Sequence, residues 1–242
     1  MNSLAHEEQP LVLLVDDVPA NLHVLAASLR NQYRIKTAIN GQMALDLANR
    51  EDKPQLILLD VMMPDMSGIE VLRRLREKNE TRDIPVIFVT ADMSEQNQLD
   101  GLELGADDYM TKPVVSTILR ARVRNLIERK QTEAKLRLAA HVFEHSGEGI
   151  LITDQENRIV DINPAFTRMT GYALEEVRGK DPAMLASGRT VPDVFQQMWK
   201  ALHSQGMWQG EVWNRNKDGG VVPLMMTVSV VRRADDAINY HI

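Results

Sequence analysis

The first half of the sequence predicts a doubly wound α/β fold with a five-stranded parallel sheet. The second half predicts a smaller α+β fold with an antiparallel sheet. The first prediction depends on apolar runs that alternate with segments of helical period, because such alternation gives a parallel sheet covered by helices on both faces. The second depends on short strands separated by turn residues. A stretch without glycine or proline, between Pro113 and Gly147, predicts a long helix that joins the two parts.

Four short runs are expected to be strands of the parallel sheet, and each is followed by polar residues. The runs are residues 11–15, 56–59, 85–89 and 108–111. They are followed in turn by Asp16-Asp17, Asp60, Thr90 and Lys112. Between the runs, helical period appears at Leu22, Leu25, Ala26 and Leu29, and more weakly at Ala44, Leu47 and Ala48. Ser67 with Glu70 three residues later forms the capping box of another helix.

Ligands of such a sheet lie outside the carboxyl ends of the strands, so the five polar residues are expected to converge on one pocket. Three carboxylates there repel one another strongly. At an effective dielectric constant of about 20, a pair about 4 Å apart costs about 4 kcal/mol. A single lysine cannot balance that repulsion, whereas a hard divalent cation with oxygen ligands can. Mg²⁺ is the usual ion where phosphate is also handled.

These residues resemble the response regulator receiver domain, a flavodoxin-like fold, over residues 10–128. The hallmark positions are filled by Asp16, Asp17, Asp60, Thr90, Tyr109, Lys112 and Pro113. The resemblance implies that Asp60 is the phosphoacceptor. It further implies a metal site in which Asp17 binds Mg²⁺ directly and Asp16 binds mainly through water. Asp60 and the backbone carbonyl of Met62 complete its protein ligands.

The same resemblance implies a mechanism and a partner. Asp60 takes a phosphoryl group from a histidine kinase, a phosphotransfer protein or a small phosphodonor, and Mg²⁺ and Lys112 stabilise the charge on the transferring oxygens. The switch residues are Thr90, whose hydroxyl closes on the phosphate, and Tyr109, which then turns inward. The Lys112-Pro113 bond is cis in this family.

Simpler structural roles exist for the same residues. Asp16 or Asp17 could cap the helix that begins near Pro19, Tyr109 could be an ordinary half-buried aromatic, and Lys112 a solvated charge. The coincidence at four strand ends disfavours these roles taken together. An aspartate-based phosphatase is excluded, because it needs a second carboxylate two residues after the first and Met62 stands there.

The helical stretch after Pro113 carries an apolar face made of Ile118, Leu119, Val123, Leu126 and Ile127. Ala134 and Leu138 resume the stripe seven and eleven residues after Ile127, a spacing compatible with a short parallel coiled coil and a homodimer. A solitary solvated linker helix is the alternative. The expected domain organisation is a flexible N-terminus at 1–9, a receiver at 10–128, a helical linker at 129–140 and a last domain at 141–242.

That last domain resembles a PAS domain over residues 139–242. Residues 149–154 and 158–163 form a hairpin, Thr190 with Asp193 is expected to cap a helix, and strands follow at 208–213 and 221–232. The helix face contains Phe195, Met198, Trp199 and Leu202. The resemblance is carried by Gly149-Ile150, Asn163-Pro164-Ala165-Phe166, Thr170-Gly171-Tyr172, Glu175-Glu176, and the run from Trp208 to Gly219.

The sequence does not identify a PAS ligand. His203 lies where haem-binding relatives carry an axial histidine, but a histidine at a helix end is more often a surface cap. Trp199, Trp208 and Trp213 could line a flavin pocket, yet such tryptophans are more often core. The pocket could equally be filled by side chains, with Met225 and Met226 among them.

Composition excludes several classes of function. The 242 residues contain no cysteine, so disulfides, cysteine–metal sites and cysteinyl-flavin photochemistry are excluded. A net charge of −6 argues against binding of nucleic acid. No signal peptide or run of transmembrane length is found, so we expect a cytoplasmic protein that does not contact a membrane.

The function expected from the sequence is that of a two-component response regulator. The chain itself is not expected to be an enzyme beyond its own phosphorylation and dephosphorylation. Because residues 238–242 look like the opening of a central PAS strand, we expect a C-terminally truncated PAS domain and an output domain after Ile242, with cyclic-di-GMP turnover favoured. The alternative is a ligand or redox sensor in which the PAS pocket is the input and the receiver only assembles it.

Overall fold

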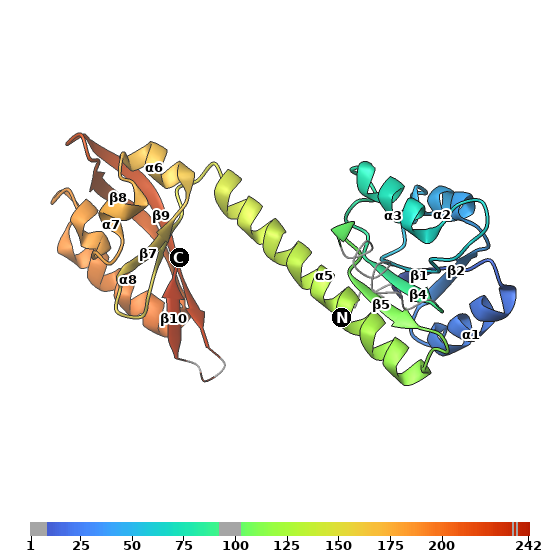
Figure 1. The fold of residues 1–242 in the computed structure, drawn as a ribbon. Coiled ribbons are helices and arrows are strands. Elements are labelled where there is room, and N and C mark those ends of the chain that lie inside the picture. The colour runs from blue at the N-terminus through green and yellow to red at the C-terminus, as the bar shows by residue number, and fades with distance from the viewer. Residues whose placement is uncertain (1–8, 92–102, 234, 236) are drawn as a thin grey trace. The chain divides into compact units, whose positions relative to one another are not determined.

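The computed structural model describes residues 9–91, 103–233, 235 and 237–242, so most of the predicted flexible segment at 1–9 lies outside the described residues. The chain forms two compact units, residues Met1–Ala134 and Lys135–Ile242 (Figure 1). Both sheets expected from the sequence are present, the first parallel and the second antiparallel. The two units are described separately below.

The first unit contains a five-stranded parallel sheet in the order β2-β1-β3-β4-β5. The strands are β1 Leu11–Val15, β2 Arg34–Ala38, β3 Leu56–Leu59, β4 Val86–Thr90 and β5 Asp108–Thr111. Every neighbouring pair is parallel. β1, β3 and β4 are buried along their whole length, as their unbroken apolar runs predict.

Helices cover both faces of this sheet. They are α1 Pro19–Leu29, α2 Gly41–Ala48, α3 Gly68–Glu77 and the long α5 Ser116–His145. Leu13 and Ile57 pack with α2 and α3 on one face, whereas Leu14 and Leu58 pack with α1 and the start of α5 on the other. This alternation follows from the two-residue period of a strand.

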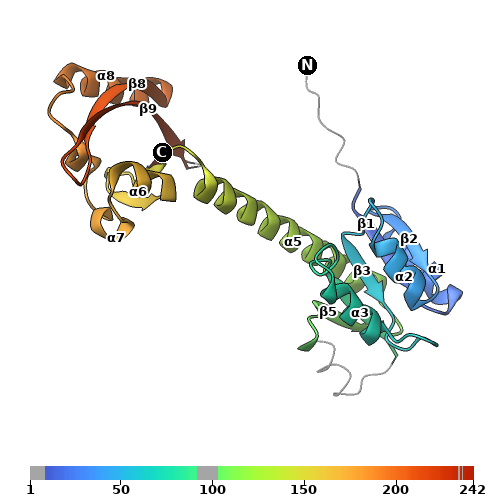
Figure 2. The same ribbon diagram turned by 90° about the horizontal axis from the view of Figure 1, so that it is seen from above.

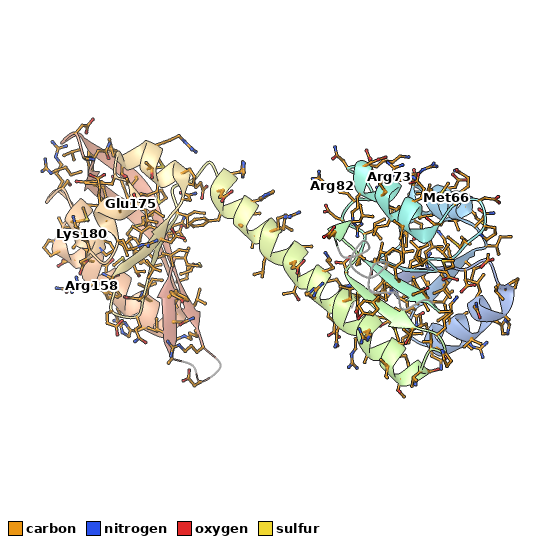
Figure 3. All side chains as sticks on the ribbon, viewed as in Figure 1. Met66, Arg73, Arg82, Arg158, Glu175 and Lys180 are labelled. Atoms are coloured by element: carbon orange, nitrogen blue, oxygen red, sulfur yellow. The ribbon has the colours of Figure 1, made fainter. Side chains whose placement is uncertain are left out.

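α5 has two different parts. Four of its five predicted apolar residues are buried against the sheet, namely Leu119, Val123, Leu126 and Ile127. The fifth, Ile118, is 48% exposed. Residues 131–142 are all exposed, and Figure 3 shows few neighbouring side chains around the middle of the helix. No helix among the described residues has the length and the apolar character needed to cross a membrane.

The second unit is built on an antiparallel sheet in the order β7-β6-β10-β9-β8, whose curvature is clear in Figure 2. Its strands are β6 Leu151–Thr153, β7 Ile159–Ile162, β8 Met207–Arg215, β9 Val221–Arg232 and β10 Ile238–His241. β10 lies in the middle of the sheet, as the sequence predicts. Its helical elements are α6 Pro164–Thr170, α7 Leu174–Val177, the 3₁₀ helix η1 Pro182–Leu185 and α8 Pro192–Gln205. A core that includes Ile159, Phe166 and Val177 joins β7 to the small helices.

The prediction for the start of α8 was wrong. The N-cap is Val191, without a side-chain cap, and the hydroxyl of Thr190 instead accepts a hydrogen bond from the backbone N–H of Trp213 at 2.8 Å. Pro192 at the first helical position has no N–H and a preset φ, so the helix needs less help from a cap. His203 is exposed near the end of α8, and its Nδ1 lies 2.7 Å from the carbonyl oxygen of Trp199.

Candidate functional site

Asp60 lies directly after the buried strand β3. Its backbone N–H donates to the carbonyl of Val15 at 2.9 Å, which extends the ladder with β1 by one residue, and its side chain is buried. The following loop returns close to the strand end, where the N–H of Gly68 donates to Val61. A Cβ at Gly68 would lie 2.1 Å from the carbonyl oxygen of Asp60, so only glycine allows this approach. The backbone thus fixes where Asp60 lies.

Lys112 connects two of the carboxylates. Its Nζ lies 2.7 Å from Oδ2 of Asp16 and 2.7 Å from Oδ2 of Asp60. Burial of the ammonium lowers the pKa of Lys112, but the hydrogen bonds and charges of the two carboxylates together outweigh burial and raise this pKa above its usual value. The Lys112-Pro113 bond is cis, as the resemblance implies. Lys112 is therefore a charged bridge and not a solvated side chain.

Asp16 is also held by the start of α1. Its Oδ1 accepts hydrogen bonds from the backbone N–H of Val18 at 2.9 Å and from the side-chain amide of Asn21 at 3.0 Å. Asp16 thus satisfies groups at the beginning of the helix and belongs to the acidic cluster as well, although the N-cap residue itself is Val18. Asn21 was missed from the sequence, where only its position four residues after the acidic pair could have suggested it.

The three carboxylates can hold a metal ion. Asp16, Asp17 and Asp60 each offer an oxygen, and these oxygens lie within 4.8 Å of one another. Asp17 is half-buried and accepts no hydrogen bond from any described residue. A cluster made only of oxygen donors suits a hard cation such as Mg²⁺. The carbonyl of Met62 stays a predicted ligand. The backbone N–H of Met62 donates a hydrogen bond to Oδ1 of Asp60 at 3.3 Å.

The two predicted switch residues lie on neighbouring strands. Thr90 ends β4 and is buried, and its carbonyl accepts a hydrogen bond from the backbone N–H of Lys112 at 2.9 Å. Tyr109 lies on β5, is half-buried and packs against the core beneath α2 and α3. The described structure thus brings all the predicted strand-end residues to one edge of the sheet. Their roles in switching stay predictions.

Comparison with known families gives two matches along the chain. The family model of the response regulator receiver domain matches residues 12–124, and that of the PAS domain matches residues 147–242. The chain belongs to the response regulator family. Its receiver domain carries the site described above, and its PAS domain contains the antiparallel sheet. Both are signalling modules, and together they place this response regulator in two-component signal transduction.

Curated proteins match long stretches of this chain. The response regulator is 41% identical over 161 residues to the response regulator PleD of Caulobacter vibrioides, covering 61% of this chain and 35% of PleD. It is 32% identical over 235 residues to the sensor histidine kinase TmoS of Ectopseudomonas mendocina, covering 82% of this chain and 24% of TmoS. A probable cyclic di-GMP phosphodiesterase of Vibrio cholerae is 36% identical over 151 residues, covering 60% of this chain and 34% of that protein. The chain therefore spans between a quarter and about a third of the length of these relatives.

The fold of the receiver domain also matches solved structures. One of them is the crystal structure of a signal receiver domain from Vibrio parahaemolyticus, described as belonging to a Luxo repressor protein. The sequence of that domain is 30% identical to this chain. The match covers 53% of this chain and 97% of that one, with a TM-score of 0.50. This likeness supports the receiver fold of the first unit.

Proposed function

We propose that this chain is a phosphorylation-controlled switch whose phosphoacceptor is Asp60. The observation that supports the proposal most directly is the position of Asp60. It is buried at a strand end, is bridged to Asp16 by Lys112, and offers an oxygen within 4.8 Å of oxygens of Asp16 and Asp17. An ion pair with a purely structural role would not need the third carboxylate, Asp17. It would also not explain why Asp17 accepts no hydrogen bond from any described residue. The phosphodonor is a histidine kinase or a phosphotransfer protein.

In the proposed reaction an oxygen of Asp60 attacks the phosphorus of a phosphohistidine. The new O–P bond forms as the P–N bond breaks, and the electron pair stays on the histidine nitrogen. Lys112 donates to the nucleophilic carboxylate in the resting site and can follow the charge onto the phosphoryl oxygens. When bound by Asp16, Asp17, Asp60 and the Met62 carbonyl, Mg²⁺ supplies the remaining charge stabilisation.

Intact-mass spectrometry after incubation with acetyl phosphate and Mg²⁺ tests this assignment. The wild type should gain one phosphoryl group and Asp60→Asn none. Asp65→Asn is the matched control, because Asp65 is exposed in the following loop and its φ of 67° suits asparagine as well as aspartate. Uptake by Asp60→Asn at the rate of the wild type would show that the nucleophile lies elsewhere.

We further propose that α5 relays the switch to the PAS domain. Asp107, which immediately precedes β5, accepts from the backbone N–H of Val86 at 3.1 Å and pairs with Lys130 of α5 at 3.0 Å. In the PAS domain, Asn163 donates to the carbonyl of Phe143, near the end of α5, at 3.1 Å. Each end of the exposed segment is thus tied to its own domain by polar contacts.

The same segment is proposed to pair with a second copy of the chain. Ile127 is buried in the receiver core and cannot belong to the pairing stripe, but Ala134, Leu138 and Val142 follow at four-residue spacing on one face and are exposed. Leu138→Glu should convert a dimer into a monomer in light scattering at tens of micromolar. Leu136→Glu, on another face and equally exposed, should leave the dimer intact. A wild-type monomer, with or without beryllofluoride, would contradict this proposal.

The proposed output is cyclic-di-GMP turnover by a domain of the whole protein. The likeness to a probable cyclic di-GMP phosphodiesterase supports it. Replacing the chromosomal codon of Asp60 by one for asparagine should change the cellular concentration of cyclic di-GMP. An unchanged concentration, under conditions in which the wild type is phosphorylated, would refute this output and leave the phosphorylation site intact.

A further inference from the structure

We infer that Asn21 is a positioning residue that orients the Asp16 carboxylate for metal binding. The Nδ2 of Asn21 lies 3.0 Å from Oδ1 of Asp16, and Asp16 is 1% exposed. An ionised carboxylate only accepts hydrogen bonds, so the amide nitrogen and not the amide oxygen of Asn21 faces it. This inference depends on the metal site of the proposed function and assigns it a residue outside its acidic ligands.

The two carboxylate oxygens of Asp16 accept hydrogen bonds from three donors. Oδ1 takes the Asn21 amide and the backbone N–H of Val18, whereas Oδ2 takes the ammonium of Lys112. Two donors on one oxygen and one on the other fix both the plane of the carboxylate and its rotation about χ2. Of these three donors, the Asn21 amide alone can be deleted without changing the charge of the site or its backbone.

The helix makes Asn21 a firm support. Asn21 is the third residue of α1, and its own backbone N–H donates to the carbonyl of Val18 at 3.0 Å. Pro19 presets the backbone of the first turn, and Leu22 anchors that turn in the core. The amide therefore projects from ordered backbone toward Asp16, which is how groups behind a metal ligand usually hold it.

Loss of the amide has a predictable direction. With one donor fewer on Oδ1, the Asp16 carboxylate can rotate so that both oxygens approach Lys112. A cation must then compete with the ammonium for the same group. Substitution of residues that support metal ligands typically lowers metal affinity by 10- to 100-fold. We expect a loss within that range for the Mg²⁺ affinity of Asn21→Leu, which keeps the side-chain size and removes the donor.

Isothermal titration of the 242-residue chain with MgCl₂ tests the inference. Gln42→Leu is the matched control, since the Gln42 amide donates at 2.9 Å to the carboxylate of Asp46, an exposed contact within α2 that involves none of the predicted metal ligands. We expect Gln42→Leu to bind Mg²⁺ like the wild type and Asn21→Leu to bind about 10- to 100-fold more weakly. Asn21→Gln, which keeps an amide, should recover part of the affinity.

The outcomes separate two failures. Equal Mg²⁺ affinity of the wild type and Asn21→Leu would overturn the role of Asn21 and leave the metal site standing. Absence of Mg²⁺ binding by the wild type would overturn the metal site itself. Should Asn21→Leu fail to fold by circular dichroism, Asn21→Ser removes the amide with a smaller side chain. It should show the same loss of affinity, and an unchanged affinity would refute the inference.

Discussion

Replacing Lys112 by methionine should destabilise the metal-free protein strongly. The variant leaves Asp16 and Asp60, which are 1% and 5% exposed, without their shared cation. Carboxylate oxygens within 4.8 Å of one another repel by at least about 3.5 kcal/mol per pair at an effective dielectric constant of about 20. Removing one partner of a buried ion pair typically costs about 3–5 kcal/mol. We therefore expect a loss of about 3–5 kcal/mol in the free energy of unfolding.

Magnesium should reverse much of that loss. Lys112→Met makes the site more negative by one charge, so it should bind Mg²⁺ more tightly than the wild type does. A ligand that binds only the folded state adds about 2.7 kcal/mol at 100 times its Kd. Tighter binding means that a given Mg²⁺ concentration stabilises the variant more. The difference in the free energy of unfolding between Lys112→Met and the wild type should therefore shrink as the Mg²⁺ concentration rises.

Urea unfolding with and without Mg²⁺ measures both effects. Lys36→Met is the control, because Lys36 pairs with Asp52 at 3.1 Å on the surface, where an ion pair contributes about 0–1 kcal/mol. An equal loss in the two variants would refute the reasoning, as would a Lys112→Met deficit that Mg²⁺ leaves unchanged. The pKa of Lys112 is raised in the folded protein, so its stabilising contribution is complete below the ordinary lysine pKa of about 10.5. That contribution is lost as pH rises through the raised value.

Three further predictions concern other parts of the molecule. Hydrogen bonds from Arg73 and Arg74 lower the pKa of Glu70 to about 2, so NMR should find the Glu70 carboxylate ionised at about pH 3.5, and Arg73→Gln should raise this pKa. The stabilising contribution of ionised Glu70 is present above the ordinary glutamate pKa of about 4.5 and is lost as pH falls through about 2. Met62 has an exposed side chain that cannot orient water, so Met62→Asn should speed the loss of a radiolabelled phosphoryl group, and an unchanged or slower rate would contradict this. Asn163→Ala deletes the buried acceptor of two backbone N–H groups and should lower the free energy of unfolding in urea by about 3 kcal/mol. A loss below about 1 kcal/mol would contradict this prediction.

The strand ends could be predicted from the sequence because β1, β3 and β4 are buried on both faces and read as unbroken apolar runs. Once three such strands are recognised, parallel topology places their carboxyl ends together, and Asp16, Asp17 and Asp60 follow. β2 could not be located in the same way. It is an edge strand with one buried residue, Ala38, and the charged residues Arg34 and Lys36 interrupt its pattern.

Side-chain partners were harder to predict than elements. Thr190 and Asp193 fit the spacing of a capping box, yet Thr190 binds the backbone of Trp213, 23 residues further along the chain. Asn21 was missed for a different reason: its partner Asp16 is near in the sequence but lies outside the helix, where helical spacing does not apply. Local spacing describes what a residue can do within its own element. It does not rank that option against a partner that only the fold brings near. Asp92, which follows Thr90 by two residues in the sequence, lies outside the described residues.

The charges at the candidate site explain why a cation and an anionic donor belong together there. Three carboxylates and one ammonium leave about two negative charges in a largely buried volume. A phosphodonor that brings further negative charge meets repulsion unless a divalent cation first neutralises the site. Lys112 cannot supply that neutralisation, because its single positive charge is already included in this balance. We therefore expect the proposed phosphorylation of Asp60 to depend on a divalent cation, and a rate that stays unchanged in EDTA would refute this expectation.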